Sequence, residues 1–194
     1  VVHAGLRQRE LGGVLMSLIR DFLARNQLDS GESTLPRQAV SGSLQTSNGN
    51  LRLTYLTARK TESVGNVRVP CNTAQVGATL CRIGVYSVAT NGDIALIGST
   101  PNDTALWASA STSYTKALSA SFTKYRGVRY AVGLLVVGTS TAPAFWGNNG
   151  LLGAELGQSP RITGIVTGQT DLPASVTAAS IGDTGHVLYS VLLP

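Results

Sequence analysis

The chain has 194 residues, of which 43% are hydrophobic and 13% charged. The hydrophobic share excludes a wholly disordered chain, and the length allows one domain with an extension. The formal charge of +5 comes from basic residues spread thinly from Arg7 to Arg161, so we expect a mildly basic surface and no nucleic-acid partner, with phosphate binding as the weaker alternative.

The first segment, residues 1–28, is expected to be a helical assembly segment. Its apolar residues recur at helical spacing, while charged residues occupy the other side. Two packings are open for this apolar face, against copies of itself or against the chain's own β domain. The residues that we expect at the oligomerisation contact are Leu11, Leu15, Leu18 and Phe22.

Residues 29–42 contain turn formers and a proline but no hydrophobic period, so they are expected to form a linker. The β domain is then expected over residues 43–194. A low charge content and 22 glycines suit an all-β domain, in which Ser and Thr line the solvent faces and Gly serves turns.

Alternating apolar residues predict about eight strands in this domain. The Asn91-Gly92 pair between two of them predicts a tight hairpin. The long connections and the lack of an interleaved helical pattern favour a mainly β fold, an antiparallel β-sandwich of the jelly-roll type behind an N-terminal α-helix. The expected strands span residues 51–55, 62–69 (closed by Pro70), 81–88, 93–98, 118–122, 130–137, 161–167 and 187–193.

The strand over residues 130–137 is the expected centre of the domain, because both of its alternating faces are apolar or small. Such a strand must be covered on both sides. A second sheet is the expected cover for one face, and a neighbouring subunit is a candidate for the other. The Gly, Asn and Pro rich passage over residues 138–158 is expected to be irregular.

Nothing in the sequence predicts a metal or another cofactor. His3 and His186 lie at opposite ends of the chain, and no pair has zinc-ligand spacing. Cys81 alternates with Ile83, which favours a buried thiol, although a disulfide with Cys71 is geometrically possible. The apolar runs are shorter than the roughly 20 residues that span a bilayer, so no membrane insertion is expected.

No catalytic signature is present, and we expect no enzyme. Acidic residues lie in the predicted loops, where a glycosidase would keep its two carboxylates. Acids beside Gly and Asn are ordinarily turn formers, however. The acids concerned are Asp93, Asp103, Glu155, Asp171 and Asp183.

Three aromatic residues are the candidates for a glycan-binding site, since an aromatic face and an apolar sugar face exclude water from each other. They are Trp107, Tyr114 and Trp146, with Tyr125 as a further stacking candidate. Trp107 is equally a candidate core plug between the sheets, whereas Trp146 is the one expected to be exposed.

Four phrases follow one another along the chain: Leu51-Arg-Leu-Thr-Tyr-Leu-Thr-Ala-Arg59, Thr79-Leu-Cys-Arg-Ile-Gly-Val-Tyr-Ser-Val88, Ser99-Thr-Pro-Asn-Asp-Thr104 and Tyr125-Arg-Gly-Val-Arg-Tyr-Ala-Val-Gly133. In this order they resemble the C-terminal domain of minor tail or tail fibre proteins of tailed bacteriophages, especially phages that infect actinobacteria. The resemblance covers roughly residues 43–194. It implies a carbohydrate-binding-like jelly roll that faces the host envelope around a three-fold axis, and it carries over no catalytic residue.

Three functions are weighed. The first is a virion structural protein, a tail fibre, tail-tip or receptor-binding component on the particle exterior, whose partners are sister copies (a trimer), other virion proteins and a host glycan. The second is a head fibre or capsid decoration protein with the same fold. The third is an envelope polysaccharide hydrolase that uses Asp103, Asp171 or Asp183.

Overall fold

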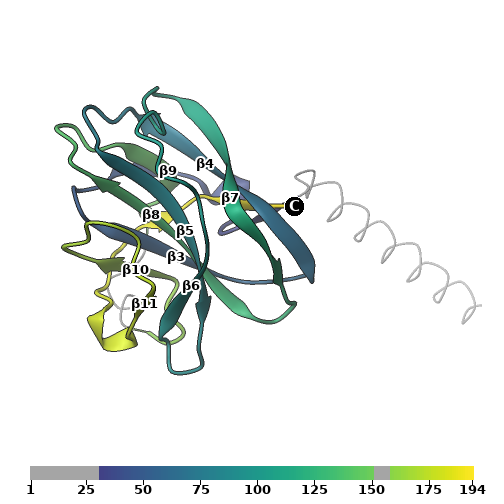
Figure 1. Cartoon of the computed structure of the whole chain (residues 1–194). Helices are drawn as coiled ribbons and strands as arrows, with labels where there is room; N and C mark the ends of the chain where they lie inside the picture. Colours follow the sequence, from purple (N-terminus) through teal and green to yellow (C-terminus); the bar gives the residue numbers. More distant parts are fainter. Residues whose placement is uncertain (1–30, 151–157) are drawn as a thin grey trace, which may run out of the picture. The chain divides into compact units, whose positions relative to one another are not determined.

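The computed structural model describes residues 31–150 and 158–194; the expected helix and its oligomerisation face lie outside these ranges. The described chain forms two antiparallel sheets (Figure 1). The first sheet holds β1 (Glu32–Ser33), β2 (Gly42–Gln45), β4 (Glu62–Thr73), β7 (Thr112–Lys124), β9 (Ala144–Asn148), β12 (Val187–Leu188) and β13 (Val191–Leu193). The second holds β3 (Leu51–Thr57), β5 (Leu80–Val88), β6 (Ile94–Ser99), β8 (Arg129–Val137), β10 (Thr163–Val166) and β11 (Ser175–Val176).

The strands β2 to β9 form a jelly roll. They pair in the order β2-β9-β4-β7 in one sheet and β3-β8-β5-β6 in the other. The chain passes from sheet to sheet between most consecutive strands, as a jelly roll requires. The predicted mainly β, antiparallel sandwich is therefore confirmed. Five further short strands, β1 and β10 to β13, extend the two sheets.

The strand β8 is central, as predicted, with β3 and β5 on its two sides. Tyr130 and Leu134 on one face belong to the core between the sheets. Ala131 and Leu135 on the other face pack with apolar residues of the segment 166–181. The second cover is thus a later segment of the same chain and not a neighbouring subunit.

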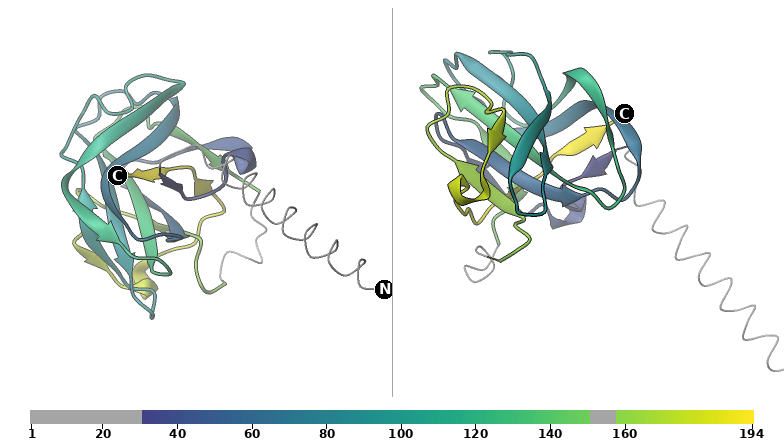
Figure 2. Two further views of the ribbon diagram at one scale, coloured as in Figure 1. Left: turned by 90° about the vertical axis from the view of Figure 1, so that its right-hand side faces the viewer. Right: turned by 60° about the horizontal axis from the view of Figure 1, so that its bottom comes forward.

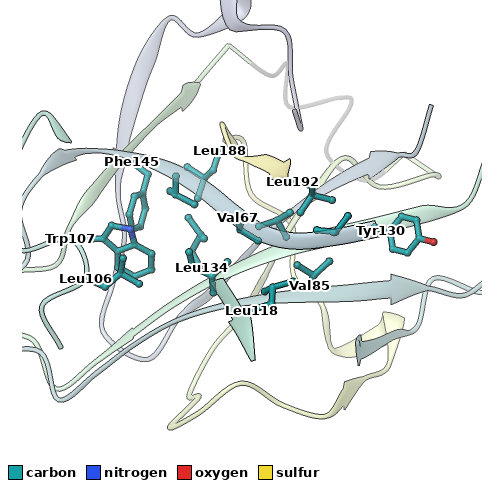
Figure 3. Packing of buried hydrophobic residues seen from close by; sticks show 14 of the residues in the cluster. Val67, Val85, Leu106, Trp107, Leu118, Tyr130, Leu134, Phe145, Leu188 and Leu192 are labelled. Atoms are coloured by element: carbon teal, nitrogen blue, oxygen red, sulfur yellow. The ribbon is translucent and has the colours of Figure 1, made fainter. Parts of the chain in front are cut away.

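The core between the sheets is one continuous hydrophobic cluster (Figure 3). Trp107 and Leu106 lie at one end of it, and Tyr130 lies at the other. Cys71 and Cys81 are both buried in this cluster as free thiols. Burial raises the pKa of Cys71 to about 11 and, together with the charge of Asp103, that of Cys81 to about 12, so both stay protonated at neutral pH.

The predicted hairpin is present between β5 and β6. The Ala89 N–H donates to the Asp93 carbonyl over 2.8 Å, and Gly92 has a φ of 89°, which glycine adopts without strain. The predicted end of β4 at Pro70 is wrong, because the strand continues to Thr73. Pro70 lies between the residues of β4 that pair with β13 and those that pair with β9, where a missing N–H is tolerated.

The described part of the expected linker, residues 31–42, differs from the prediction. β1 pairs with β13, and a short 3-10 helix, η1 (Arg37–Ala39), follows. Leu35 is buried against Tyr189 and Val191. The compact β unit therefore begins at Gly31 and not at residue 43. The segment is held by the buried Leu35 and by the pairing of β1 with β13. Neither feature gives a periodic hydrophobic pattern in the sequence, so neither could be predicted from it.

The closing strand expected over residues 187–193 is divided. β12 pairs with β9, whereas β13 pairs with β4 and, on its other side, with β1. Figure 2 shows this yellow C-terminal strand beside the purple β1. The Thr34 hydroxyl donates to the Leu188 carbonyl over 2.7 Å and accepts from the Ser190 N–H over 3.0 Å, so it bridges the break. Across the described ranges, no helix is long and apolar enough to cross a membrane.

Candidate functional site

An open hollow of about 420 Å³ lies over the first sheet. This volume is within the roughly 300–1,000 Å³ of typical ligand sites. Its residues come from separate elements, η1, β4, β7, β9 and the break between β12 and β13. They are Arg37, Val40, Arg68, Pro70, Ser113, Trp146 and Tyr189.

Trp146 is the aromatic residue that this hollow offers to solvent. It lies on β9 directly after Phe145, and successive side chains of a strand point to opposite faces. Phe145 is fully buried in the core, so Trp146 points outward, where it stays 36% exposed. The expectation that Trp146 is exposed is therefore confirmed, although it lies on a strand and not in an irregular passage.

The backbone that carries the indole is paired with its neighbours on the sheet. Tyr189 is buried beside it, and the Tyr189 N–H donates to the Trp146 carbonyl over 2.9 Å. Ser43 lies opposite Trp146 on β2 and accepts from the Asn72 amide over 2.9 Å. These contacts fix the backbone on which the ring is carried, so a ligand would meet a formed surface.

The lining of the hollow includes polar and basic residues. Arg37 on η1 and Arg68 on β4 contribute guanidinium groups, and Ser113 on β7 contributes a hydroxyl. The apolar part of the lining comes from Val40, Pro70 and the two aromatic residues. A lining that combines apolar and aromatic groups with polar ones suits the two kinds of surface of a sugar ring.

Trp107 lies in a different environment. Its side chain is fully buried, and its ring meets that of Phe145 edge to face with centroids 4.7 Å apart. Its backbone has a φ of 65°, which the turn after β6 imposes. The ring is a plug at the end of the core and is not offered to a surface ligand.

Tyr114 is also outside the hollow. It is half-buried on β7 opposite Val69, a core residue, and it packs against the core. Its hydroxyl accepts from the Ser109 N–H over 2.7 Å. The structure therefore does not bring the three sequence candidates together, and only Trp146 lines the hollow.

The candidate acids are engaged by basic or backbone groups in separate places. Asp103 pairs with Lys116 at 2.6 Å, Asp171 with Arg82 at 2.8 Å, and Asp183 with Arg161 at 2.7 Å. The hydrogen bond from Lys116 holds the pKa of Asp103 below its ordinary value. That is the opposite of the raised pKa that a general acid needs.

The Asp93 carboxylate lies at the β5–β6 hairpin, where it accepts a hydrogen bond from the Ala178 N–H over 2.8 Å. Glu155 lies outside the described residues. Within residues 31–150 and 158–194, no group of three His, Cys, Asp or Glu side chains is placed to hold a metal ion.

Sequence reasoning missed most of the hollow. Arg37 lies in the expected linker, and Tyr189 lies in what was expected to be a continuous strand. Arg68 and Pro70 carry no local signal beyond strand alternation. The only local hint was Trp146, a tryptophan outside the predicted strands.

Together the fold and the hollow define a jelly-roll β-sandwich with a candidate ligand-binding face on its first sheet. Neither a scan against protein-family models nor a search of curated proteins finds a match for this chain.

Proposed function

We propose that this chain is a structural protein of a tailed-bacteriophage virion, displayed at a tail fibre or tail tip, and that its β-sandwich binds a host-envelope glycan. The observation that carries the proposal is the outward Trp146 ring in an open hollow whose lining combines aromatic, apolar and polar residues. The resemblance of several sequence phrases to phage minor tail proteins supports the virion context.

Binding without turnover is the activity that this arrangement favours. The hollow contains no acidic residue, and Asp103, Asp171 and Asp183 are each ion-paired. An open site with one exposed aromatic ring binds weakly by itself. Several linked copies, such as a trimer held together by the N-terminal segment and mounted on other virion proteins, raise the overall affinity without any new contact.

The test is binding of the full chain to an array of envelope polysaccharides from actinobacteria. We expect binding to at least one of these polysaccharides. The affinity should fall about tenfold or more in the Trp146→Ala variant, as for an aromatic residue that the bound ligand covers. Because Trp146 is only 36% exposed, the variant should lose some stability, so its binding is measured well below its own unfolding midpoint. Val76→Ala, which trims an exposed apolar side chain outside the hollow, is the control.

Three results would contradict this function. Equal binding by the wild type and Trp146→Ala would show that the hollow is not the site, and an absence of glycan binding would favour a capsid decoration role. Release of new reducing ends from a polysaccharide, abolished by Asp103→Asn or Asp171→Asn, would identify a hydrolase instead.

A further inference from the structure

A second surface feature lies at the end of the sandwich where the β3–β4 and β7–β8 turns meet. The Gly127 N–H donates to the Ala58 carbonyl over 2.7 Å, and the Ala58 N–H donates to the Val128 carbonyl over 2.9 Å. The Arg126 N–H donates to the Thr61 hydroxyl over 3.0 Å. These bonds hold the two turns side by side. We call the surface that they form with the start of β10 the basic tip, defined by Arg59, Lys60, Tyr125, Arg126, Val128, Arg129, Arg161 and Ile162.

Basic residues gather at this tip, although they are far apart in the sequence. Arg59 and Lys60 come from the first turn, Arg126 and Arg129 from the second, and Arg161 precedes β10. The side chains of Arg59 and Arg126 are exposed. In the sequence, each of these three groups is more than thirty residues from the next, so the basic residues look evenly dispersed along the chain.

The acidic residues at this end do not cancel the charge of the exposed arginines. The carboxylates of Glu32 and Glu62 bind the buried ammonium of Lys124 at 2.5 and 2.9 Å, and Glu62 also pairs with Lys60 of the tip at 2.6 Å. Asp183 pairs with Arg161 at 2.7 Å. The acids are thus engaged, and the positive potential at the tip comes from the outermost residues, Arg59 and Arg126.

Apolar side chains are exposed at the same place. Tyr125 is 58% exposed, Ile162 43% and Val128 40%. In the described ranges, only Val76 and Trp146 are other large hydrophobic residues with comparable exposure. Exposed apolar groups that cluster among charges indicate an interaction surface, whereas single scattered ones do not.

Part of the tip is held in place before any ligand arrives. The Arg129 guanidinium lies 5.3 Å from the centre of the Tyr55 ring and donates to the Arg161 carbonyl. The Tyr125 N–H donates to the Tyr130 hydroxyl over 2.9 Å, which fixes the start of the turn. A ligand that binds here therefore meets little ordering cost in the backbone.

We infer that the basic tip is a second binding site, and that its ligand is an acidic polysaccharide with carboxylate groups. Guanidinium groups match carboxylates in geometry, and sugar rings offer apolar faces to Tyr125, Val128 and Ile162. Single-stranded nucleic acid is the less suitable polyanion, because its successive bases stack on several aromatic rings and the tip exposes only one.

The test measures binding of the full chain to polygalacturonate at low and moderate salt, with the fully methyl-esterified polymer as the uncharged counterpart. We expect salt-sensitive binding to the acid form alone. Arg126→Gln should weaken it about two- to fivefold, and Arg59→Gln with Arg126→Gln about tenfold, as for exposed charge contacts. Lys116→Gln removes the same charge from β7 away from the tip and should have little effect.

Further variants and ligands distinguish this inference from the alternative explanations. Tyr125→Ala should weaken binding with the salt dependence unchanged, since it removes a contact and no charge. Trp146→Ala should leave binding to polygalacturonate intact, so failure of this site and failure of the Trp146 hollow are distinguishable. Equal binding to the ester form, an equal effect of Lys116→Gln, or tighter binding of a single-stranded oligonucleotide would overturn the inference. A change in oligomer mass in the double arginine variant would overturn it as well, because it would make the tip a contact between copies.

Discussion

The Tyr86 ring packs on two glycines that face each other across the second sheet. Gly84 on β5 pairs with Gly133 on β8. A Cβ atom at Gly133 would lie 2.8 Å from a Leu51 methyl carbon and 3.0 Å from a Tyr86 ring carbon, and one at Gly84 would lie 2.9 Å from the same ring. The missing side chains therefore make the room in which the fully buried Tyr86 fits against the centre of the sheet.

We expect Gly133→Ala to lower the free energy of unfolding by about 1–3 kcal/mol, because a methyl group there overpacks the cluster around Tyr86. Chemical denaturation measures this. Gly65→Ala is the matched control, since its Cβ would lie 3.5 Å from the nearest atom, an ordinary contact. Equal unfolding free energies for the two variants would contradict this packing.

At the scale of elements, a buried ion pair fastens the start of the domain to the first sheet. Lys124 on β7 is fully buried and binds Glu32 of β1 at 2.5 Å and Glu62 of β4 at 2.9 Å. Its ammonium also donates to the Lys60 carbonyl over 3.0 Å, and Glu32 accepts from the Arg59 N–H over 2.7 Å. Since a buried charge is costly without partners, these contacts specify where β1 docks.

The same cluster makes stability depend on pH. Burial raises the pKa of Glu62, but the hydrogen bonds and charges of Lys60 and Lys124 outweigh it, so the net pKa is lower than the ordinary value of 4.5. The unfolded state then binds the proton first as the pH falls, and Glu62 contributes stability above pH 4.5 that is lost below it. We expect the thermal midpoint to drop in this range and Glu62→Gln to flatten the drop.

Lys60→Gln is the companion variant for this titration. It keeps the Glu62 carboxylate and removes one donor, so the folded-state pKa of Glu62 moves back toward its ordinary value. The drop should therefore be smaller and end at a higher pH than in the wild type. A Glu62→Gln profile that superimposes on the wild-type profile between pH 5 and 2 would show that Glu62 does not contribute.

The sequence predicted those strands and turns that short stretches of residues specify by themselves. The apolar alternation of β3, β5 and β8 and the Asn91-Gly92 turn were sufficient for the fold class. The short strands β2 and β9 were missed, since β2 has little alternation and β9 lies in a Gly and Asn rich passage. The hollow and the basic tip could not be predicted, because their residues meet only through contacts between segments far apart in the chain.

On the scale of the whole molecule, the sandwich covers parts of its own outer faces. Leu192 points into the core, whereas its neighbour Val191 points outward and packs with Leu35. On the second sheet, the segment 166–181 covers the outer face of β8 and is fastened by the Arg82–Asp171 ion pair. These two parts of the outer faces are therefore covered by the chain itself, whereas the hollow and the tip stay exposed.

The proposed function as a displayed binding module depends on several linked copies, because one open hollow would give only weak attachment. The expected contact is the apolar face of Leu11, Leu15, Leu18 and Phe22, which the β domains must support since it spans fewer than two heptads. Light scattering behind size exclusion at micromolar concentration measures the copy number most directly. We predict three times the chain mass of 20.1 kDa for the wild type and one chain for Leu15→Asp with Leu18→Asp. A monomeric wild type would contradict the assembly on which the proposed function depends.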